Sequence, residues 1–336
     1  LHYMDLLSIA TVADVVPLRG VNRIFVKQGL AQMSKTRWVG LNALMDVARV
    51  GGELDAFDLG FRLGPRLNAC GRLYDATTGV KLLTTHDPQL ARLLSGELDK
   101  ANRERQDIEA QILTEAIDQV SQESELRSGY VLCDEKWHPG VIGIVASRLV
   151  ERFCRPFVLL GSDGENLKGS ARSFGSLNLV EALRACEKHL IKYGGHKAAA
   201  GVTLKKDNYL AFSAQFNDHV AHLLSEKDFL PRIDIDAELD VESSGEDLLE
   251  MISQLKPFGQ GNPEPIFVSH ALSVSFPQIV GEKHLKFKVG SDLKPAIAFK
   301  MSHLKENFKK SVDMVYHFKM DSFTKKPIFH VKDIKI

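Results

Sequence analysis

The sequence contains few cysteines, no long apolar run and no net charge, and each of these shortages excludes a class of protein or site. The four cysteines are scattered without a CxxC spacing, so neither a zinc site nor a disulfide framework is indicated. No apolar run approaches the roughly 18 residues that a membrane span needs. No signal peptide opens the chain. We therefore expect a cytoplasmic protein with free thiols and no membrane segment.

The net charge of zero hides an uneven distribution along the chain. Residues 282–336 contain 13 lysines, no arginine and six acidic residues, which places +7 on this segment and −7 on residues 1–281. Aromatic residues are interleaved with these lysines, at Phe287, Phe299, Phe308, Tyr316, Phe318, Phe323 and Phe329. Proteins that bind single strands combine lysines that follow phosphates with exposed rings that stack on bases. Inward-facing core rings beneath a solvated lysine face would produce the same pattern.

A glycine-rich segment at residues 192–201 leaves bare backbone beside one titratable ring. Gly194 and Gly195 allow main-chain N–H groups to approach an anion closely, and His196 adds a donor that charges near neutral pH. The segment therefore predicts a phosphate-binding loop. Two adjacent glycines are also typical of a plain turn.

Two further segments carry similar chemistry. Residues 137–140 (WHPG) lie between an apolar strand and an amphipathic helix, which is the order of a phosphate-binding loop, and His138 is the candidate residue there. A helix start punctuated by proline and glycine explains the same residues. Strand alternation over residues 168–173 sends Ser170 and Arg172 to one face, where a hydroxyl and a guanidinium suit a phosphate or a sugar.

Together these segments resemble the DHHA1 domain of the DHH phosphoesterase superfamily, whose GGH-x-AAG signature is matched by residues 194–201. Residues 4–18 are similar to the fourth DHH motif of the RecJ single-strand exonucleases. Residues 64–73 (GPRLNACGRL) and 257–265 (PFGQGNPEP) also resemble RecJ. The resemblance extends over essentially the whole chain, so the sequence is identified as a member of the RecJ family.

The resemblance implies a site for two divalent metal ions, Mn²⁺ or Mg²⁺, of which this sequence would supply the ligand Asp14, with Asp5 a weaker candidate. No Asp-His-His, the motif that names the superfamily, occurs in the chain, and the chain starts at Leu1 without a methionine. We therefore expect a piece of a longer protein that binds DNA without degrading it, because hard-cation sites need several oxygen ligands. Without the family, Asp14 would be interpreted as a turn or cap residue.

The implied function is hydrolysis of single-stranded DNA from the 5′ end, in DNA repair and recombination, with metal ions activating the attacking water. The resemblance implies that Asp14 and His196 are catalytic. The implied substrate-binding residues are Arg66, Arg72, His138, Ser170, Arg172, Gly194, Gly195 and His196. Asn68 would orient Arg66 or the strand, or simply form a turn.

The expected fold class is α/β plus β. Its four parts are a C-terminal remnant of a DHH α/β domain at 1–87, a long connecting helix at 88–125, a DHHA1 α/β domain at 126–228 and an OB-like β-barrel at 229–336. In the first part we predict a strand that ends at Ala13 and a glycine-rich loop at 64–73. The periodic apolar stripe from residue 88 to residue 120 predicts one long helix, although the stripe is interrupted at Arg105.

The later elements follow from alternating strand and helix patterns. We predict strands at 130–133, 157–160, 167–172 and 199–204, and helices at 142–153, 177–189 and 209–224. After Pro231 we predict a strand at 233–236, a helix at 245–255 and then short strands that form a five-stranded barrel.

Two other functions fit parts of the sequence. A DHH phosphoesterase that cleaves oligoribonucleotides or cyclic dinucleotides shares the GGH loop, but such enzymes typically end soon after it, whereas this chain continues to residue 336. A non-catalytic nucleic-acid-binding module would need the basic barrel alone. The family resemblance implies single-strand binding protein and recombination helicases as partners of the intact protein, and we expect a monomer.

Overall fold

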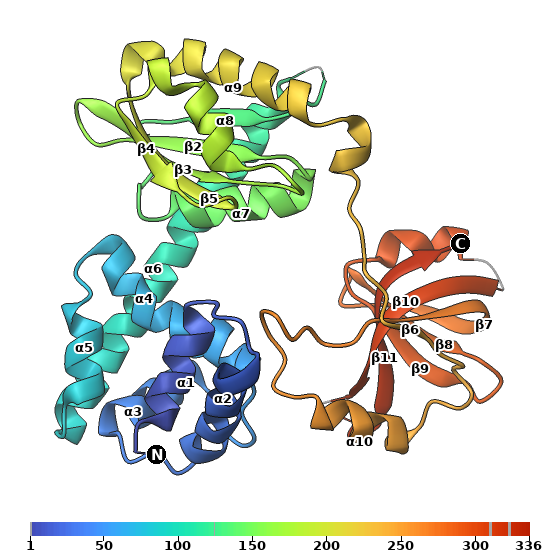
Figure 1. Cartoon of the computed structure of the whole chain (residues 1–336). Coiled ribbons are helices and arrows are strands. Elements are labelled where there is room, and N and C mark those ends of the chain that lie inside the picture. Colours follow the sequence, from blue (N-terminus) through green and yellow to red (C-terminus); the bar gives the residue numbers. More distant parts are fainter. Residues whose placement is uncertain (1, 124, 309–310, 322–323) are drawn as a thin grey trace. The chain divides into compact units, whose positions relative to one another are not determined.

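The computed structural model describes residues 2–123, 125–308, 311–321 and 324–336 (Figure 1). The chain folds as two compact units. One comprises Leu1–Lys35, Gly52–Gly60 and Ile233–Ile336, and the other comprises Thr36–Gly51 and Phe61–Arg232. In the described part of the chain, no helix is both long enough and apolar enough to cross a membrane.

The residues before position 88 form helices, and this corrects two of our predictions. The helices are α1 (Met4–Ala13), α2 (Gly20–Met33), α3 (Val39–Ala48), the π-helix η1 (Asp58–Leu63), α4 (Gly64–Leu73) and α5 (Thr77–Thr84). The predicted strand ending at Ala13 is wrong, because α1 buries Asp5, Ser8 and Ile9 at helical spacing. A short apolar run has the same composition in a buried helix and in a buried strand.

The predicted glycine-rich loop at 64–73 is helix α4, so that prediction is also wrong. Pro65 lies in the first turn, where a missing N–H costs nothing. Gly64, Ala69 and Cys70 are buried small residues of α4. The helix packs against the long helix α6 (Pro88–Ser121). Tertiary packing therefore outweighs the low helix propensity of its glycines.

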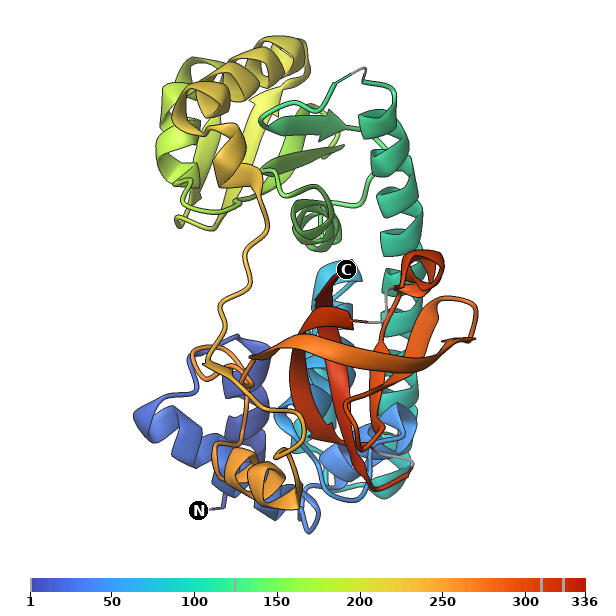
Figure 2. The same ribbon diagram turned by 90° about the vertical axis from the view of Figure 1, so that its right-hand side faces the viewer.

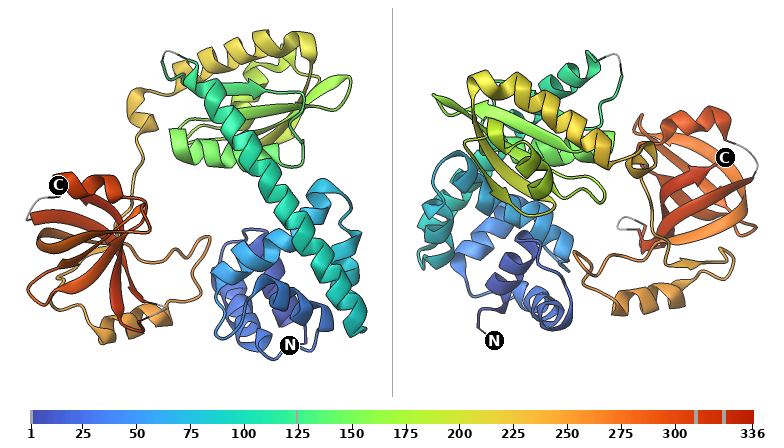
Figure 3. Two further views of the ribbon diagram at one scale, coloured as in Figure 1. Left: turned by 180° about the vertical axis from the view of Figure 1, so that it is seen from behind. Right: turned by 45° about the horizontal axis from the view of Figure 1, so that its top comes forward.

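The predicted connecting helix is confirmed as α6 (Pro88–Ser121), which Figure 3 shows running along the second unit. Asp87 caps its start by accepting a hydrogen bond from the Gln89 N–H at 2.8 Å. One end of α6 packs against α3, α4 and α5, and the other end packs against α7 (Ile142–Phe153). This helix joins the helical bundle of the unit to its sheet.

The sheet of this unit has the strand order β1-β2-β3-β5-β4. Its strands are β1 (Tyr130–Cys133), β2 (Phe157–Ser162), β3 (Asn166–Arg172), β4 (Lys192–Gly195) and β5 (Ala199–Lys205). The pair β1 and β2 is parallel and the other pairs are antiparallel. Four of these strands were predicted, and β4 was missed because it ends in two glycines, which are uncommon in strands.

Helices cover both faces of this sheet. α7, seen nearly end-on in Figure 2, covers one face together with the end of α6, and α8 (Leu179–Ala185) and α9 (Tyr209–Leu223) cover the other. The predicted helix at 177–189 is shorter than expected, because α8 ends at Ala185. Short 3-10 turns follow at η2 (Glu187–His189), η3 (Lys206–Asn208) and η4 (Glu226–Phe229).

The C-terminal region is a closed barrel of five strands, as predicted. Its elements are β6 (Ala237–Glu238), α10 (Glu246–Gln254), β7 (Phe267–Val280), β8 (His284–Val289), β9 (Lys294–Ala298), η5 (Ser302–Asn307), β10 (Ser311–Met320) and β11 (Pro327–Lys335). The strand order is β10-β11-β9-β8-β7-β6. A further pairing of β10 with β7 closes a ring of five strands, and the short β6 is a sixth strand that pairs with β7 outside the ring. The strand predicted at 233–236 is wrong, since β6 begins at Ala237.

Most aromatic residues of the lysine-rich segment belong to the barrel core. Phe287, Tyr316, Phe318 and Phe329 are buried and contact one another or neighbouring core residues. Phe308 is partly buried against the same cluster, and Phe323 lies outside the described residues. The core interpretation of the aromatic pattern therefore holds for these buried rings.

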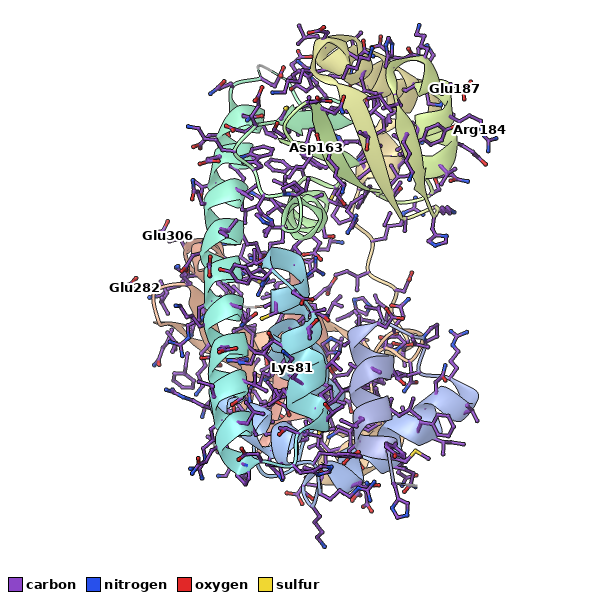
Figure 4. All side chains as sticks on the ribbon, turned by 90° about the vertical axis from the view of Figure 1, so that its left-hand side faces the viewer. Lys81, Asp163, Arg184, Glu187, Glu282 and Glu306 are labelled. Carbon is purple, nitrogen blue, oxygen red and sulfur yellow. The ribbon has the colours of Figure 1, made fainter. Side chains whose placement is uncertain are left out.

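Two acidic side chains of the same segment point away from the core. Glu282, in a turn, and Glu306, on η5, project outward from the barrel (Figure 4).

The segment at 257–265 packs by backbone contacts against the chain that follows α1. The Leu18 N–H donates to the Gln260 carbonyl at 2.6 Å, and Arg19 Nε donates to the Gly261 carbonyl at 2.7 Å. A Cβ at Gly259 would lie 2.8 Å from Leu18 Cδ1, so the close approach requires glycine. The motif therefore holds two distant parts of its unit together.

Candidate phosphate-binding site

Ser170 and Arg172 lie side by side on β3 and face the first turns of α7, as strand alternation predicted. A Cβ at Gly143 would lie 2.8 Å from Ser170 Oγ and 3.0 Å from Arg172 Nη2. Glycine at this position therefore allows the start of α7 to approach both side chains. The N-terminus of a helix carries partial positive charge and favours anions.

The Arg172 guanidinium is held in one orientation by its neighbours. Its Nη1 donates to Ser170 Oγ and to the Ala171 carbonyl, both at 2.9 Å, and its Nε donates to Ser147 Oγ at 3.2 Å. These acceptors are neutral, so they satisfy the N–H groups without balancing the charge. Arg172 is therefore an oriented cation that lacks a carboxylate among these hydrogen-bond partners.

Arg72, at the end of α4, reaches the same region from the helical bundle. Its Nη1 donates to the Gly140 carbonyl at 3.2 Å. A Cβ at Gly140 would lie 2.1 Å from the Arg72 carbonyl oxygen, so the two backbones meet where no side chain fits. Gly140 is required here for close approach, which is one of the reasons that a phosphate loop contains glycine.

The charge of Arg72 acts on Arg172 and on Arg105, and the charge of Arg148 also acts on Arg105. We call Arg72, Arg105, Arg148 and Arg172 the arginine cluster. Burial lowers the pKa of Arg172, and the charge of Arg72 lowers it further. Burial also lowers the pKa of Arg105; the charge of Glu109 raises it, and the charges of Arg72 and Arg148 lower it. Guanidinium groups stay protonated at neutral pH, so these directions indicate unfavourable charge that a bound anion would relieve.

A strip of bare backbone runs from Ser170 across the sheet. Ser170 is opposite Gly201 on β5, and Gly201 is opposite Gly194 on β4. Residues directly opposite in an antiparallel pair project to the same face. We call Gly194 and Gly201 the glycine strip. Both are exposed, so the strip leaves flat space beside Ser170 and Arg172.

Gly195 is the last residue of β4, and His196 follows it in the turn between β4 and β5. Gly195 has a φ of +150°, and a Cβ there would lie 2.4 Å from the Ala199 carbonyl oxygen, so this glycine is needed for the hairpin itself. The His196 N–H donates to the same Ala199 carbonyl at 2.8 Å, and His196 is exposed. Because Ala199 is opposite Arg172, the structure places His196 in the turn at the Arg172 end of β5.

His138 shapes the loop that meets Arg72. Its Nδ1 accepts a hydrogen bond from the Gly140 N–H at 3.1 Å. The preceding Trp137 is buried, and its Nε1 donates to Glu115 on α6 at 2.7 Å. The structure therefore assigns His138 a role in holding the loop in shape.

Arg66 is engaged by a carboxylate, in contrast to Arg72. Its Nε donates to Asp99 at 2.9 Å, and its Nη1 donates to the Arg62 carbonyl at 2.7 Å. Asp99 also pairs with Arg103. The structure does not bring Arg66 into the arginine cluster, and Asn68 is an exposed residue of α4.

Asp14 is exposed and ends α1, with its N–H donating to the Ala10 carbonyl at 3.0 Å. Asp5 is fully buried, and its Oδ1 accepts a hydrogen bond from the Leu6 N–H at 2.8 Å. Among the described residues, no three side chains of His, Cys, Asp or Glu are grouped so that they could hold a metal ion. The donors present do not fit the two-metal site that the family resemblance implies.

Sequence reasoning missed three contributors, namely Gly143, Arg105 and Arg148. Gly143 fell within the helix predicted at residues 142–153 and was given no role. Arg105 left a signal, because it interrupts the apolar stripe of the long helix, and it is buried in the structure. A charged residue in such a stripe is uncommon unless it is paired, so this interruption was informative.

The barrel presents a second, different surface. Phe299 is 46% exposed and lies between the rings of His284 and His330, with centroid distances of 5.2 and 5.4 Å. Phe276 is also exposed, and Lys288 Nζ lies 5.9 Å from the centroid of its ring. Exposed rings beside lysines are the arrangement on which single-stranded bases stack.

Two family models match the chain. The DHHA1 domain matches residues 105–222, and the RecJ OB domain matches residues 235–333. The first match covers the sheet with the second half of α6, and the second covers the barrel.

Curated relatives extend the similarity beyond these two domains. The single-stranded-DNA-specific exonuclease RecJ of Dickeya dadantii is 38% identical over 338 residues, which cover 95% of this chain and 58% of that protein. RecJ of Bacillus subtilis is 37% identical over 294 residues, which cover 86% of this chain and 37% of that protein. The chain thus matches between 37% and 58% of the length of these two relatives.

Solved structures bear out the expected fold class. The crystal structure of RecJ from Thermus thermophilus in complex with Mn²⁺ superposes with a TM-score of 0.88 at 32% identity, covering all of this chain and 50% of that one. The Mg²⁺ complex of the same protein gives a TM-score of 0.87. By sequence and by fold, the chain is therefore similar to RecJ over nearly its whole length, and it carries a DHHA1 domain followed by a RecJ OB domain.

Proposed function

We propose that this chain binds single-stranded DNA as part of a 5′-to-3′ exonuclease, and that Arg72, Ser170 and Arg172 hold the phosphate at the 5′ end. The observation that carries the proposal is that two arginines from different elements reach the segment 140–143. Arg72 of α4 donates to the Gly140 carbonyl, and Arg172 of β3 lies beside Gly143. An anion bound between the two guanidiniums would be stabilised, because its negative charge balances both positive charges.

A terminal phosphate suits this site better than an internal one. A phosphate monoester carries close to two negative charges at neutral pH, whereas a diester carries one. The two arginines and the hydroxyl of Ser170 supply donors for several phosphate oxygens. A preference for the 5′ end follows, because the extra charge exists only at the end of a strand that carries this phosphate.

The nucleotide attached to that phosphate would lie over the glycine strip. Gly194 and Gly201 leave room for a sugar or a base, and His196 lies in the turn beside the strip. We propose that His196 contacts the first nucleotides, whereas Gly195 serves the hairpin. Arg66 is paired with Asp99, so its proposed contact with the strand would require that pair to open.

We propose that the barrel holds the strand through its lysines and through Phe276 and Phe299. The excess of lysine over acidic residues from residue 282 onward supports an electrostatic, sequence-independent contact. This surface also argues against a small-substrate phosphoesterase, which has no need of a second binding region. A purely non-catalytic module would not need the arginine cluster.

Divalent metal ions would supply the hydrolytic chemistry of the intact protein. The Thermus RecJ structures contain Mn²⁺ or Mg²⁺, and we propose the same ions here, with Asp14 as one ligand and the others outside this sequence. The residues in this chain would bind and orient the strand. We expect the chain to bind DNA without degrading it.

The test is equilibrium binding of one single-stranded oligonucleotide with either a 5′-phosphate or a 5′-hydroxyl group, across a range of salt concentrations. We expect tighter binding of the phosphorylated strand, and we expect affinity for both strands to fall as salt rises. Equal affinities would contradict the terminal-phosphate site. We expect no degradation of either strand. If the chain degraded the strand in the presence of Mn²⁺, and Asp14→Ala abolished this activity, that expectation would be wrong.

We also propose a role in DNA repair and recombination for the intact protein, together with single-strand binding protein and recombination helicases, and a monomeric state. These proposals rest on the RecJ relationship. Analytical ultracentrifugation of the chain with and without an oligonucleotide would test the monomeric state.

A further inference from the structure

We infer that Glu109 is a positioning residue that fixes the two halves of the phosphate site against each other through Arg105 and Arg148. This inference rests on the proposed phosphate site and adds a residue to it that would not touch the substrate. Glu109 lies on α6, whereas Arg72 and Arg172 come from α4 and β3.

Glu109 is an almost fully buried carboxylate with two arginine partners. Its side chain is 2% exposed; it pairs with Arg105 one turn earlier on α6 and with Arg148 on α7. Asn102 accepts a further hydrogen bond from Arg105 Nη2 at 3.0 Å. A buried carboxylate is tolerated only when it is paired, and removal of one partner of a buried pair is strongly unfavourable. The three side chains therefore form one unit that joins α6 to α7.

This unit lies at the joint where the phosphate site is assembled. Arg72 belongs to the helical bundle, which packs on α6, whereas Arg172 belongs to the sheet, which α7 covers. The hydrogen bond from Arg72 to the Gly140 carbonyl crosses the same joint. The spacing between Arg72 and Arg172 thus depends on how firmly α6 holds α7, and the ion pair between Glu109 and Arg148 makes that connection.

Glu109 also affects the site through its negative charge. The charges of Arg72 and Arg148 both act on Arg105, and Glu109 is the carboxylate that opposes them. Without Glu109, the cluster would hold four unopposed guanidiniums, and Arg105, which is buried, would be driven outward by repulsion. Attraction for any DNA would persist or increase, whereas the fitted spacing for a terminal phosphate would be lost.

The ratio of affinities for the 5′-phosphorylated and 5′-hydroxyl forms of one oligonucleotide separates these effects. We expect Glu109→Ala and Glu109→Gln to lower this ratio about tenfold, the size of one charge-assisted hydrogen bond, while affinity for the 5′-hydroxyl strand stays equal or rises. Arg148→Met tests the same joint from a side chain that is 55% exposed, and Arg105 remains in this variant to pair with Glu109. We expect the ratio to fall in this variant too.

Glu115→Ala is the matched control, because Glu115 also links α6 to the sheet domain, through Trp137, but lies outside the arginine cluster. An unchanged ratio in Glu109→Gln and Arg148→Met would overturn the inference, even if thermal stability fell. A fall of equal size in Glu115→Ala would also overturn it, because any loosening of α6 would then suffice. A wild-type ratio of one would instead refute the phosphate site itself.

Discussion

The sheet domain and the barrel present two different surfaces for the same kind of polyanion. In the sheet domain the cations are arginines, oriented by hydrogen bonds to Ser147, Ser170 and the Gly140 carbonyl. On the barrel they are lysines, one of which, Lys288, lies beside the exposed ring of Phe276. Planar guanidiniums suit a phosphate at one fixed place, whereas flexible ammonium groups suit a backbone that slides.

The difference explains why one chain would need both surfaces. An exonuclease must locate an end, which requires a fixed site, and must hold the rest of the strand without regard to its sequence. The arginine cluster offers the first property because hydrogen bonds and ion pairs hold its members in place. The barrel offers the second because its charges are spread over exposed strands. The comparison predicts that mutations in the two regions will differ in kind as well as in size.

The largest effect is expected where the backbone of α4 meets the loop that precedes α7. Gly140→Ala would place a Cβ 2.1 Å from the Arg72 carbonyl oxygen, so the two segments must separate. We expect a loss of about 2–4 kcal/mol in the free energy of unfolding, measured by chemical denaturation, together with loss of preference for the 5′-phosphate. Gly96→Ala is the control, since no described atom lies within 4 Å of a Cβ there. Equal stability of the two variants would contradict the close approach.

Arg172→Met should come next. It removes an oriented charge and its hydrogen bonds to the phosphate, so we expect affinity for a 5′-phosphorylated strand to fall about thirtyfold, with little change for the 5′-hydroxyl strand. Fluorescence anisotropy with both oligonucleotides would measure this. Arg184→Met is a suitable control, because Arg184 is exposed on α8 and points outward together with Glu187 (Figure 4). If Arg184→Met reduced the affinity equally, the loss in Arg172→Met would reflect the general charge of the protein and not a specific phosphate site.

On the barrel, Phe299→Ala should weaken binding of long single strands about tenfold, the size of one base–aromatic stack. The 5′-phosphate preference should stay intact, since that property belongs to the sheet domain. Phe299→Trp should preserve binding. An unchanged affinity of Phe299→Ala for a long oligonucleotide would show that the ring does not stack on bases.

Replacing Lys286 and Lys288 by Gln should produce a smaller loss that depends on salt. Each phosphate contact contributes about 0.7 to the slope of log affinity against log salt for single strands, so the slope should decrease in magnitude by about 1.4. Titration at several salt concentrations measures the slope. Lys81→Gln on α5 is the control, and an equal change of slope there would remove the distinction between the two surfaces.

The smallest effect concerns pH. Burial lowers the pKa of His330 below its ordinary value of 6.5, and the charge of Lys319 lowers it further. The unfolded state therefore binds more protons as pH falls below about 6.5, so the stability of the barrel decreases in that range and is retained above it. Hydrogen exchange of the β11 amides at pH 7 and pH 5.5 would measure this. His330→Asn should reduce the pH dependence, whereas replacement of the exposed His303 by Gln should not.

Several features of the fold were predictable because they follow from local geometry. The long helix α6 follows from a periodic apolar stripe with an aspartate cap and a proline start. Strand β3 follows from alternation, which also placed Ser170 and Arg172 on one face. The helices at residues 4–13 and 64–73 were not predictable in this way, because a buried apolar run and a glycine-containing segment take the structure that their neighbours stabilise.

The sequence by itself therefore determined the identities of the charged and small residues, the alternation that pairs Ser170 with Arg172, and the uneven distribution of charge. Only the tertiary structure decided that Arg72 meets Gly140, 68 positions away, and that Glu109 joins two arginines between α6 and α7. Periodicity fixes the direction of a side chain relative to its own helix or strand. Convergence of side chains depends on how separate elements pack, and close approaches such as that at Gly140 exist only in the folded chain.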